Sequence, residues 1–363
     1  MRNKLWSLAA LALALGGCAA PLPSTELPPT RLVAPAREFP ELRDYRGVVD
    51  LKLKPAGLDQ AAVAQLARDA QLDFVALGDR VTSGPSDYGI SGYTSEILFI
   101  AGGSFAVGGG EIVGVNLRDA INPPSSASDL ISAIHEQGGI AVAGDPSRFA
   151  SPADYALADA LEVYSQSAAW VAKSPTALKL SAMFFSTDRF LAHLDQIDPH
   201  DMFAYDRLAA GARVTLLAGF GSAPNMNVFG ATVGTYQQLF LFNATHLLAT
   251  ERSVDPLVDA MKHGRAYISF DFLGYVDNFA FYAQNGDART IMGDETSFAP
   301  GLKLRAELPA QADKIVIYGN GSEAASADDA TEFEFAPKSA GTYRVIAYRN
   351  GCPWIISNPV YIR

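Results

Sequence analysis

The chain has 363 residues, of which 49% are hydrophobic and 18% are charged, a composition typical of a globular protein with a substantial core. Its length favours one large domain and one small domain. A formal net charge of −11 argues against nucleic acid and anionic phospholipid as the main partners, because the field of the protein would repel both.

Residues 1–17 are predicted to be a lipoprotein signal peptide. Arg2 and Lys4 precede the short apolar run LWSLAALALAL, and LGGC follows it. This ending resembles a bacterial lipobox cut before Cys18, which implies that Cys18 carries lipid and anchors the protein in the bacterial cell envelope. Ala19 in place of Asp resembles lipoproteins of the outer membrane that face the periplasm. The alternative is an ordinary secretory signal in which the cysteine has no role.

Residues 18–46 follow as a segment rich in proline, with no sustained hydrophobic period. We expect an extended tether that holds the folded part away from the membrane.

The next segment, residues 47–274, alternates apolar strands with helical patterns. VVDLKL precedes the helical spacing of LDQAAVAQLARDAQ, and a helix is predicted from Ser126 to the pair Gly138 and Gly139. Further strands are predicted in DFVALGD, EILFIAGG, EIVGVNL, IAVAGD, ALEVYS and RVTLLAGF, and helical segments over 174–209. This order predicts a parallel sheet covered by helices, either as a closed barrel or as an open doubly wound sheet.

Residues 275–363 have a different pattern, in which strands are separated by turn residues without helices between them. The segments NFAFYAQ, LKLRAEL, KIVIYGNG, EFEFAP, TYRVIAYRNG and WIISNPVYI predict a small antiparallel β-sandwich.

The order of motifs resembles the PHP family, the polymerase and histidinol phosphatase domain. The matching segments are DLKLK, DFVALGDR, IHEQGGIAVAGDP, ALEVYS, LVDAMKHGRAYISFD and the terminal PWIISNPVYIR. The resemblance implies a distorted (β/α)7 TIM-like barrel followed by a β-sandwich. It also implies that the strand ends of the family's barrel supply histidines and acids to a cluster of metal ions.

Several metal-ligand positions of the family carry other residues in this chain. Lys52 and Lys54 stand where the first strand has histidines, and Arg80 stands where the second has one. Asp145 replaces the histidine before proline, and Ser104 stands where a glutamate is expected. The last signature has become GFGSAPN, with neither Asp nor His. Since an ammonium or guanidinium has no lone pair for a metal, these replacements predict that the phosphoesterase activity is absent.

Acids remain around these positions. Asp50 and Asp79 match the family's pattern, and Glu111 and Glu162 lie nearby in it. The complete predicted site, without catalytic or metal-binding roles, is Asp50, Lys52, Lys54, Asp79, Arg80, Ser104, Glu111, Asp145, Arg148 and Glu162.

Three interpretations of this cluster stay open. The cations could pair with neighbouring acids in a structural network that replaces the metals. Lys52, Lys54, Arg80 and Arg148 could instead bind a carboxylate, sulfate or phosphate without cleaving it, because ligands sit at strand ends in barrels. An activity that the sequence does not reveal is the third.

The other candidate features are weaker. The five histidines are scattered, and solvated helix faces explain them more simply than the metal site that His193 and His200 could form with nearby acids. GGSFAVGGGE lacks the lysine and helix start of a phosphate loop and predicts a tight turn beside the barrel mouth.

The sequence therefore predicts a lipid-anchored, PHP-like pseudoenzyme that binds a small anionic ligand or an envelope protein and needs no cofactor. The alternative is a metal-dependent phosphoesterase that holds zinc, manganese or iron in a reduced site at Asp50, Asp79, Glu111, Asp145 and Glu162.

Overall fold

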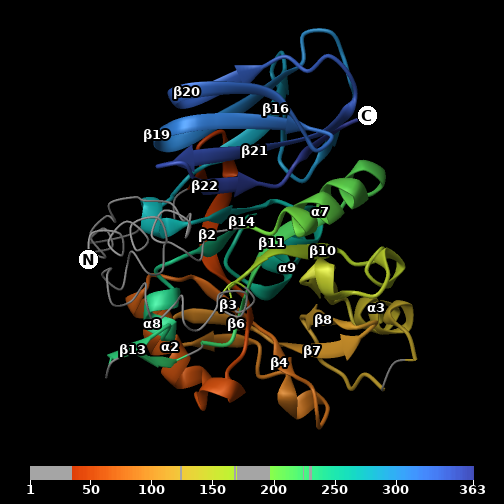
Figure 1. Ribbon diagram of the computed structural model, residues 1–363, viewed down its shortest axis with the longest axis vertical. Coiled ribbons are helices and arrows are strands. Elements are labelled where there is room, and N and C mark those ends of the chain that lie inside the picture. Colours follow the sequence, from red (N-terminus) through yellow and green to blue (C-terminus); the bar gives the residue numbers. More distant parts are fainter. Residues whose placement is uncertain (1–34, 123–124, 167–168, 170–196, 224, 229–230) are drawn as a thin grey trace, which may run out of the picture.

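The protein combines a mixed α/β region with a C-terminal region built of strands, drawn in blue in Figure 1. The structure is a computed structural model that describes residues 35–122, 125–166, 169, 197–223, 225–228 and 231–363. The mixed α/β class and the strand-rich C-terminal region predicted from the sequence are confirmed. No helix within the described ranges is long and apolar enough to cross a membrane.

Strand β2 (Phe39–Leu51) lies at the centre of the α/β region. Its second half pairs in parallel with β3 (Phe74–Leu77) on one side and with β11 (Thr215–Gly221) on the other. The strands between them are β4 (Asp79–Arg80), β6 (Ile97–Ile100), β7 (Gly102–Val107), β8 (Gly110–Val115), β9 (Ile140–Gly144) and β10 (Ala160–Ser165). Strands β3 and β4 pair in parallel with β6 and β7, and the pairing continues from β7 through β8, β9 and β10 to β11, so the series returns to β2.

The predicted parallel arrangement fails at β8, which runs antiparallel to both β7 and β9. Gly108 and Gly109 cause this reversal, because both adopt positive φ, 61° and 85°, in the turn that joins β7 to β8. The tight turn predicted for this glycine-rich segment is therefore confirmed.

Helices cover this sheet, and four of them begin at side-chain caps. The Asp59 carboxylate accepts a hydrogen bond from Ala62 N at 2.8 Å, and Ser126 Oγ, the cap predicted from the sequence, accepts one from Asp129 N at 3.1 Å. The helices are α2 (Gln60–Asp69), α3 (Ala127–Glu136), α7 (Pro199–Gly211), α8 (Tyr236–Leu239) and α9 (Val254–His263). Short 3-10 helices are η1 (Lys54–Ala56), η2 (Pro85–Asp87), η3 (Pro146–Arg148), η4 (Pro152–Asp154) and η6 (Asp271–Leu273). The helical prediction for 174–196 lies outside the described residues.

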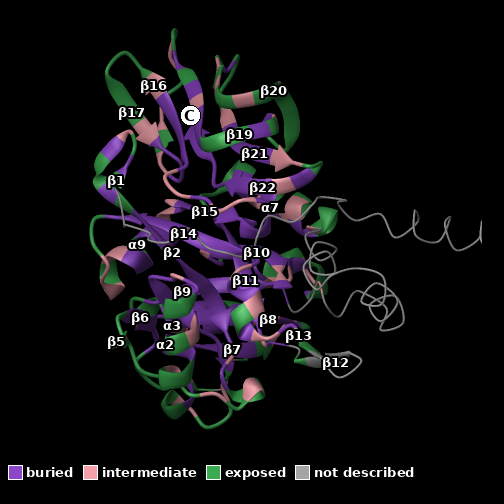
Figure 2. Ribbon diagram, turned by 90° about the vertical axis from the view of Figure 1, so that its left-hand side faces the viewer, coloured by how far each residue is buried: buried purple, intermediate pink, exposed green. Residues whose placement is uncertain are grey.

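The C-terminal strands continue the pairing of the α/β region. Strand β15 (Ala266–Ser269) pairs with β14 (Ala244–Ala249) and also with β22 (Cys352–Ser357). The other C-terminal strands are β16 (Ala280–Asn285), β17 (Ala288–Ile291), β18 (Glu295–Thr296), β19 (Lys303–Gly319), β20 (Ser322–Phe335), β21 (Gly341–Arg349) and β23 (Val360–Ile362). Short strands elsewhere are β1 (Pro35–Ala36), β5 (Gly92–Thr94), β12 (Met226–Val228) and β13 (Ala231–Val233). Figure 2 shows that buried residues concentrate in the central strands, whereas β17 and β20 carry many exposed ones.

The strands begin earlier in the chain than predicted. The sequence predicts an extended tether through Arg46, but β2 begins at Phe39, and its first half pairs antiparallel with β14. The prediction rested on proline content and the lack of a hydrophobic period. Asp44 and Arg46 interrupt any such period, and both are fully buried here.

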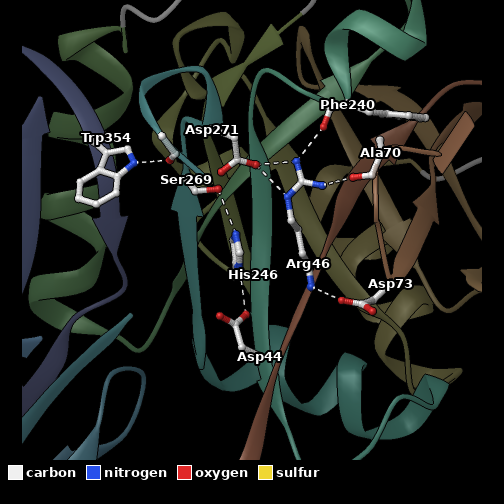
Figure 3. Close-up of polar contacts among 10 residues, drawn as sticks. Asp44, Arg46, Ala70, Asp73, Phe240, His246, Ser269, Asp271 and Trp354 are labelled. Atoms are coloured by element: carbon white, nitrogen blue, oxygen red, sulfur yellow. Dashed lines mark hydrogen bonds and ion pairs between the residues drawn. The ribbon is translucent and has the colours of Figure 1, made fainter. Parts of the chain in front are cut away.

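Arg46 is buried because all of its donor nitrogens have acceptors (Figure 3). Its Nε donates to Asp271 Oδ2 at 2.8 Å, while Nη1 and Nη2 donate to the carbonyls of Ala70 and Phe240, each at 2.8 Å. The guanidinium of Arg46, on β2, thus bonds to the end of α2, to the residue that follows α8, and to η6.

His246 corrects a second prediction. It lies fully buried in β14, not on a solvated helix face. Its Nδ1 lies 2.8 Å from Asp44 Oδ1 and its Nε2 lies 3.0 Å from Ser269 Oγ, as Figure 3 shows. The ring stacks on Tyr267 with centroids 4.2 Å apart. This histidine therefore joins β2, β14 and β15 where the α/β region meets the C-terminal strands.

Candidate functional site

A pocket of about 290 Å³ opens where β2, β9 and β10 end and where β7 turns into β8. Seven of the ten residues that the sequence predicts for the site line it: Asp50, Lys52, Arg80, Glu111, Asp145, Arg148 and Glu162. Gly109 and Gly110, from the β7–β8 turn, form part of its wall. Predicted site residues from several different strands therefore meet at one cavity.

Lys52 lies between two acids of the pocket. Its Nζ donates to Glu111 Oε1 at 2.6 Å, and Asp50 Oδ2 lies 3.6 Å away. The Lys52 side chain is only 16% exposed, so water screens these contacts weakly. The ammonium holds together the end of β2 and the start of β8, which are distant in the sequence.

The floor of the pocket is made of two buried carboxyl groups, Asp50 at 5% exposure and Glu162 at 3%. Each packs against a glycine. A Cβ at Gly78 would lie 1.9 Å from Asp50 Oδ1, and a Cβ at Gly219 would lie 2.1 Å from Glu162 Oε2, so any larger residue would displace them. Within the described residues, Asp50 Oδ1 and Glu162 Oε1 have no hydrogen-bond partner.

A backbone irregularity aims Asp50 into this position. The β2–β3 register shifts between Val48 and Leu51, and Asp50 adopts a left-handed φ of 57°. Bulges re-aim side chains at functional sites, and positive φ is uncommon for a residue other than glycine. The strand end is therefore shaped around the carboxyl group of Asp50.

The charges of the pocket alter one another. Burial raises the pKa of Asp50 to about 7, although the Lys52 ammonium acts against it. Burial, followed by the charge of Asp50, raises the pKa of Glu162 well above its usual range. Burial would lower the pKa of Lys52, but Asp50 and Glu111 outweigh it, so that pKa is raised. Burial also disfavours the charge of Glu111, yet Lys52 keeps the Glu111 pKa below its ordinary value.

The rim of the pocket carries two arginines in different states. Arg148 Nε lies 2.8 Å from Asp145 Oδ2, and Ser147 Oγ donates to Asp145 Oδ1 at 2.6 Å. Arg80 is exposed and makes no ion pair within the described residues. Arg80 is thus the rim cation whose charge is available to a ligand.

The remaining predicted residues lie outside the pocket lining. Lys54 turns away and its ammonium bonds to Asp87. The Asp79 carboxylate accepts hydrogen bonds from the backbone of Leu53 at 3.1 Å and of Lys54 at 2.9 Å, and Ser104 is fully buried in β7. Cys18, the predicted lipidation site, and His193 lie outside the described residues.

Lys52 and Lys54 point in different directions because the strand ends before both of them. The sequence predicts that Lys52 and Lys54 point the same way, as alternation in a strand requires. However, β2 ends at Leu51 and η1 begins at Lys54, with the intervening turn fixed by Asp79. Only Lys52 therefore reaches the pocket.

The pocket does not fit a divalent metal. In the described part of the chain, no group of three or more His, Cys, Asp or Glu side chains has an arrangement that could hold a metal ion. The Lys52 ammonium already lies beside Asp50 and Glu111, the acids that would have to bind one. An ammonium has no lone pair to donate and repels a second cation.

Sequence reasoning missed a third buried acid near the rim. Asp201, in the first turn of α7, accepts a hydrogen bond from Ser147 N at 2.9 Å. Burial, with a smaller contribution from Asp145, raises the pKa of Asp201 to about 7. An acid in a first helical turn is a common feature that gave no signal of contact with the strand ends.

Comparisons with known proteins give limited information. No family model matches the chain, and no curated protein matches it. A solved two-domain protein from Bacteroides vulgatus, described as containing a predicted PHP-like metal-dependent phosphoesterase, is similar with a TM-score of 0.45 and 10% sequence identity. The similarity covers 92% of this chain and 100% of that one.

Proposed function

We propose that the chain is a PHP-like pseudoenzyme that binds a small ligand in the pocket at the strand ends and does not hydrolyse it. In this proposal the strands from β2 to β11 form the distorted (β/α)7 TIM-like barrel of that family, and residues 275–363 form its β-sandwich. The return of the strand pairing to β2 supports the barrel, and the segments quoted from the sequence support the family.

One observation carries the proposal. The Lys52 ammonium lies 2.6 Å from Glu111 and 3.6 Å from Asp50, and the positive charge that metal ions would bring is already there. Metal-assisted hydrolysis needs open coordination positions and an activated water, and an ion-paired ammonium provides neither. The pocket keeps its volume and its acids, which suit binding better than hydrolysis.

The proposed place of action is the bacterial cell envelope. Lipid on Cys18 would anchor the chain in the outer membrane, facing the periplasm, with residues before β1 as the tether. The partners that fit are a small ligand with an anionic group or an envelope protein. Nucleic acid does not fit a chain with a net charge of −11.

Metal content and hydrolysis test the proposal together. Protein purified without chelator is measured for zinc, manganese and iron, and is assayed with p-nitrophenyl phosphate and bis-p-nitrophenyl phosphate in the presence of each metal. We expect metal far below one equivalent and no hydrolysis above the buffer rate. Stoichiometric metal with hydrolysis that disappears in Asp50→Asn would support the metal-dependent phosphoesterase instead.

A further inference from the structure

We propose that the pocket binds a small zwitterion, whose ammonium group lies against the carboxyl groups of Asp50 and Glu162 and whose anionic group contacts Arg80. This inference rests on the proposed binding function and names the class of ligand. It restricts the anion site expected from the sequence to the rim of the pocket.

The floor of the pocket has more acids than cations. Asp50, Glu111 and Glu162 line the pocket together with one ammonium beside them, that of Lys52. Lys52 donates its short hydrogen bond to Glu111 and lies 3.6 Å from Asp50. Glu162 lines the pocket and makes no hydrogen bond or ion pair within the described residues. A buried carboxyl group without donors is costly, so the floor favours a ligand that brings donors and positive charge.

An ammonium group meets this requirement well. It carries three N–H donors and one positive charge on a single atom, and it needs no ordered set of lone pairs around it as a metal does. A carboxylate or phosphate at the same depth would instead lie near the negative charges of Glu111 and, at pH 8, of Asp50, with only one ammonium beside them. The floor therefore discriminates against a simple anion.

The rim of the pocket favours an anionic group, in contrast to the floor. Arg80 lines the pocket, is exposed and has no ion-pair partner in the described part of the chain, whereas Arg148 is bonded to Asp145 at 2.8 Å. A guanidinium binds carboxylate and phosphate through two parallel hydrogen bonds. The volume of about 290 Å³ lies at the lower end of ligand pockets, which are roughly 300–1,000 Å³, and so indicates a ligand smaller than a typical drug.

A series of simple compounds tests this arrangement. The ω-amino acids from glycine to 6-aminohexanoate, and phosphoethanolamine, are titrated by calorimetry and thermal shift at pH 8. The matched single-charge probes are the alkyl carboxylates, the alkylamines and inorganic phosphate, with glycerol as a neutral hydrogen-bonding probe. We expect at least one zwitterion to bind tenfold or more tightly than the carboxylate and the amine of equal length.

Three variants assign the two ends. Glu162→Gln should reduce the affinity for the best zwitterion tenfold or more but leave weak binding of the carboxylate unchanged. Arg80→Gln should reduce zwitterion affinity and leave amine binding unchanged. Arg118→Gln, a surface arginine outside the pocket, should bind like the natural protein. Circular dichroism shows whether each variant is folded, and binding of the amine by Arg80→Gln serves as a second measure of an intact floor.

Several results would overturn the inference. These are equal affinity for the zwitterion and its single-charge analogues, tightest binding of phosphate or glycerol, no binding in the series, or unchanged zwitterion binding in Glu162→Gln. None of them alters the metal content or the hydrolysis assay, so they leave the pseudoenzyme proposal standing. Stoichiometric metal with hydrolysis would refute that proposal independently.

Discussion

Lys52 Nζ and Glu111 Oε1 lie 2.6 Å apart and join the end of β2 to the beginning of β8. A side chain of the protein supplies the cation between the two strands, and because it is covalently attached it cannot dissociate.

Replacing Lys52 should destabilise the protein far more than replacing Lys54. Lys52→Met leaves Asp50 and Glu111 half-buried to buried without their cation, a loss that typically costs about 3–5 kcal/mol. Lys54→Met removes a pair whose lysine side chain is 51% exposed, which is worth about 0–1 kcal/mol. Urea denaturation measures both free energies of unfolding. Equal losses would contradict the difference between the two lysines.

A second consequence concerns metal binding. Lys52→His exchanges the ammonium for an imidazole with a lone pair beside Asp50 and Glu111, whereas Lys52→Arg keeps a cation there. We expect calorimetry to detect zinc or manganese binding by Lys52→His and none by Lys52→Arg or the natural protein. Binding by all three would show that the ammonium does not exclude the metal.

The acid beside Lys52 should make stability depend on pH. The folded state raises the pKa of Asp50 from 3.8 to about 7, so it retains a proton that the unfolded state releases. The Asp50 contribution is therefore full below about pH 4 and is lost as the pH rises towards 7. Asp50→Asn stays neutral and tolerates the positive φ of 57°. It should be more stable above pH 7, on the order of a few kcal/mol, with a shallower pH dependence between 4 and 7.

Asp79→Asn provides the contrast in the same denaturation experiments. The Asp79 carboxylate accepts two backbone hydrogen bonds from the turn after β2, and an amide replaces one acceptor oxygen with a donor. We expect a loss of about 1–3 kcal/mol at neutral pH. If both substitutions stabilise the protein, the distinct roles assigned to the two acids are wrong.

The sequence predicted which residues meet at the pocket better than it predicted the direction and contacts of their side chains. Glu162 could be placed beside Asp50 because strand ends meet at one edge of a sheet, and this needs only the order of the strands. Glu111 was expected only from the family's pattern, and it reaches the pocket from the start of β8 because that strand runs antiparallel. The direction of Lys54 could not be predicted, because it depends on where β2 ends and on the contact of Asp79 with the turn. The raised pKa of Asp201 also depends on a contact between α7 and Ser147 that no local pattern encodes.

The start of β2 shows a second reason why part of the fold could not be predicted from the sequence. Asp44 and Arg46 look like exposed residues in the sequence, because a charge is buried only when its partners are present. Those partners, His246 and Asp271, lie about 200 residues further along the chain. Hydrophobic periodicity cannot reveal such pairs, and the prolines of residues 18–46 predict a tether instead.

The contact of Asp44, His246 and Ser269 has the geometry of a hydrolase triad but should be inert. Its two distances are 2.8 and 3.0 Å, yet all three side chains are fully buried and none lines a described pocket. A fluorophosphonate probe should therefore not label Ser269 in the folded protein. Ser269→Ala should lower stability by about 1 kcal/mol through the lost hydrogen bond. Labelling that disappears in Ser269→Ala would show that substrates reach this serine.

Arg46 should be among the most sensitive positions of the chain. Its guanidinium is fully buried, pairs with Asp271 and donates to the carbonyls of Ala70 and Phe240. Arg46→Met leaves the Asp271 carboxylate buried and uncompensated and should cost about 3–5 kcal/mol. Arg46→Lys keeps the charge but loses the planar fork, so its cost should be intermediate.

The control is Arg118→Met, because the Arg118–Asp255 pair is exposed and 3.8 Å long, and its loss should change stability by no more than about 0.5 kcal/mol. Urea denaturation of the three variants gives the order directly, and a value for Arg46→Met as small as that for Arg118→Met would show that the guanidinium does not hold β2 in place.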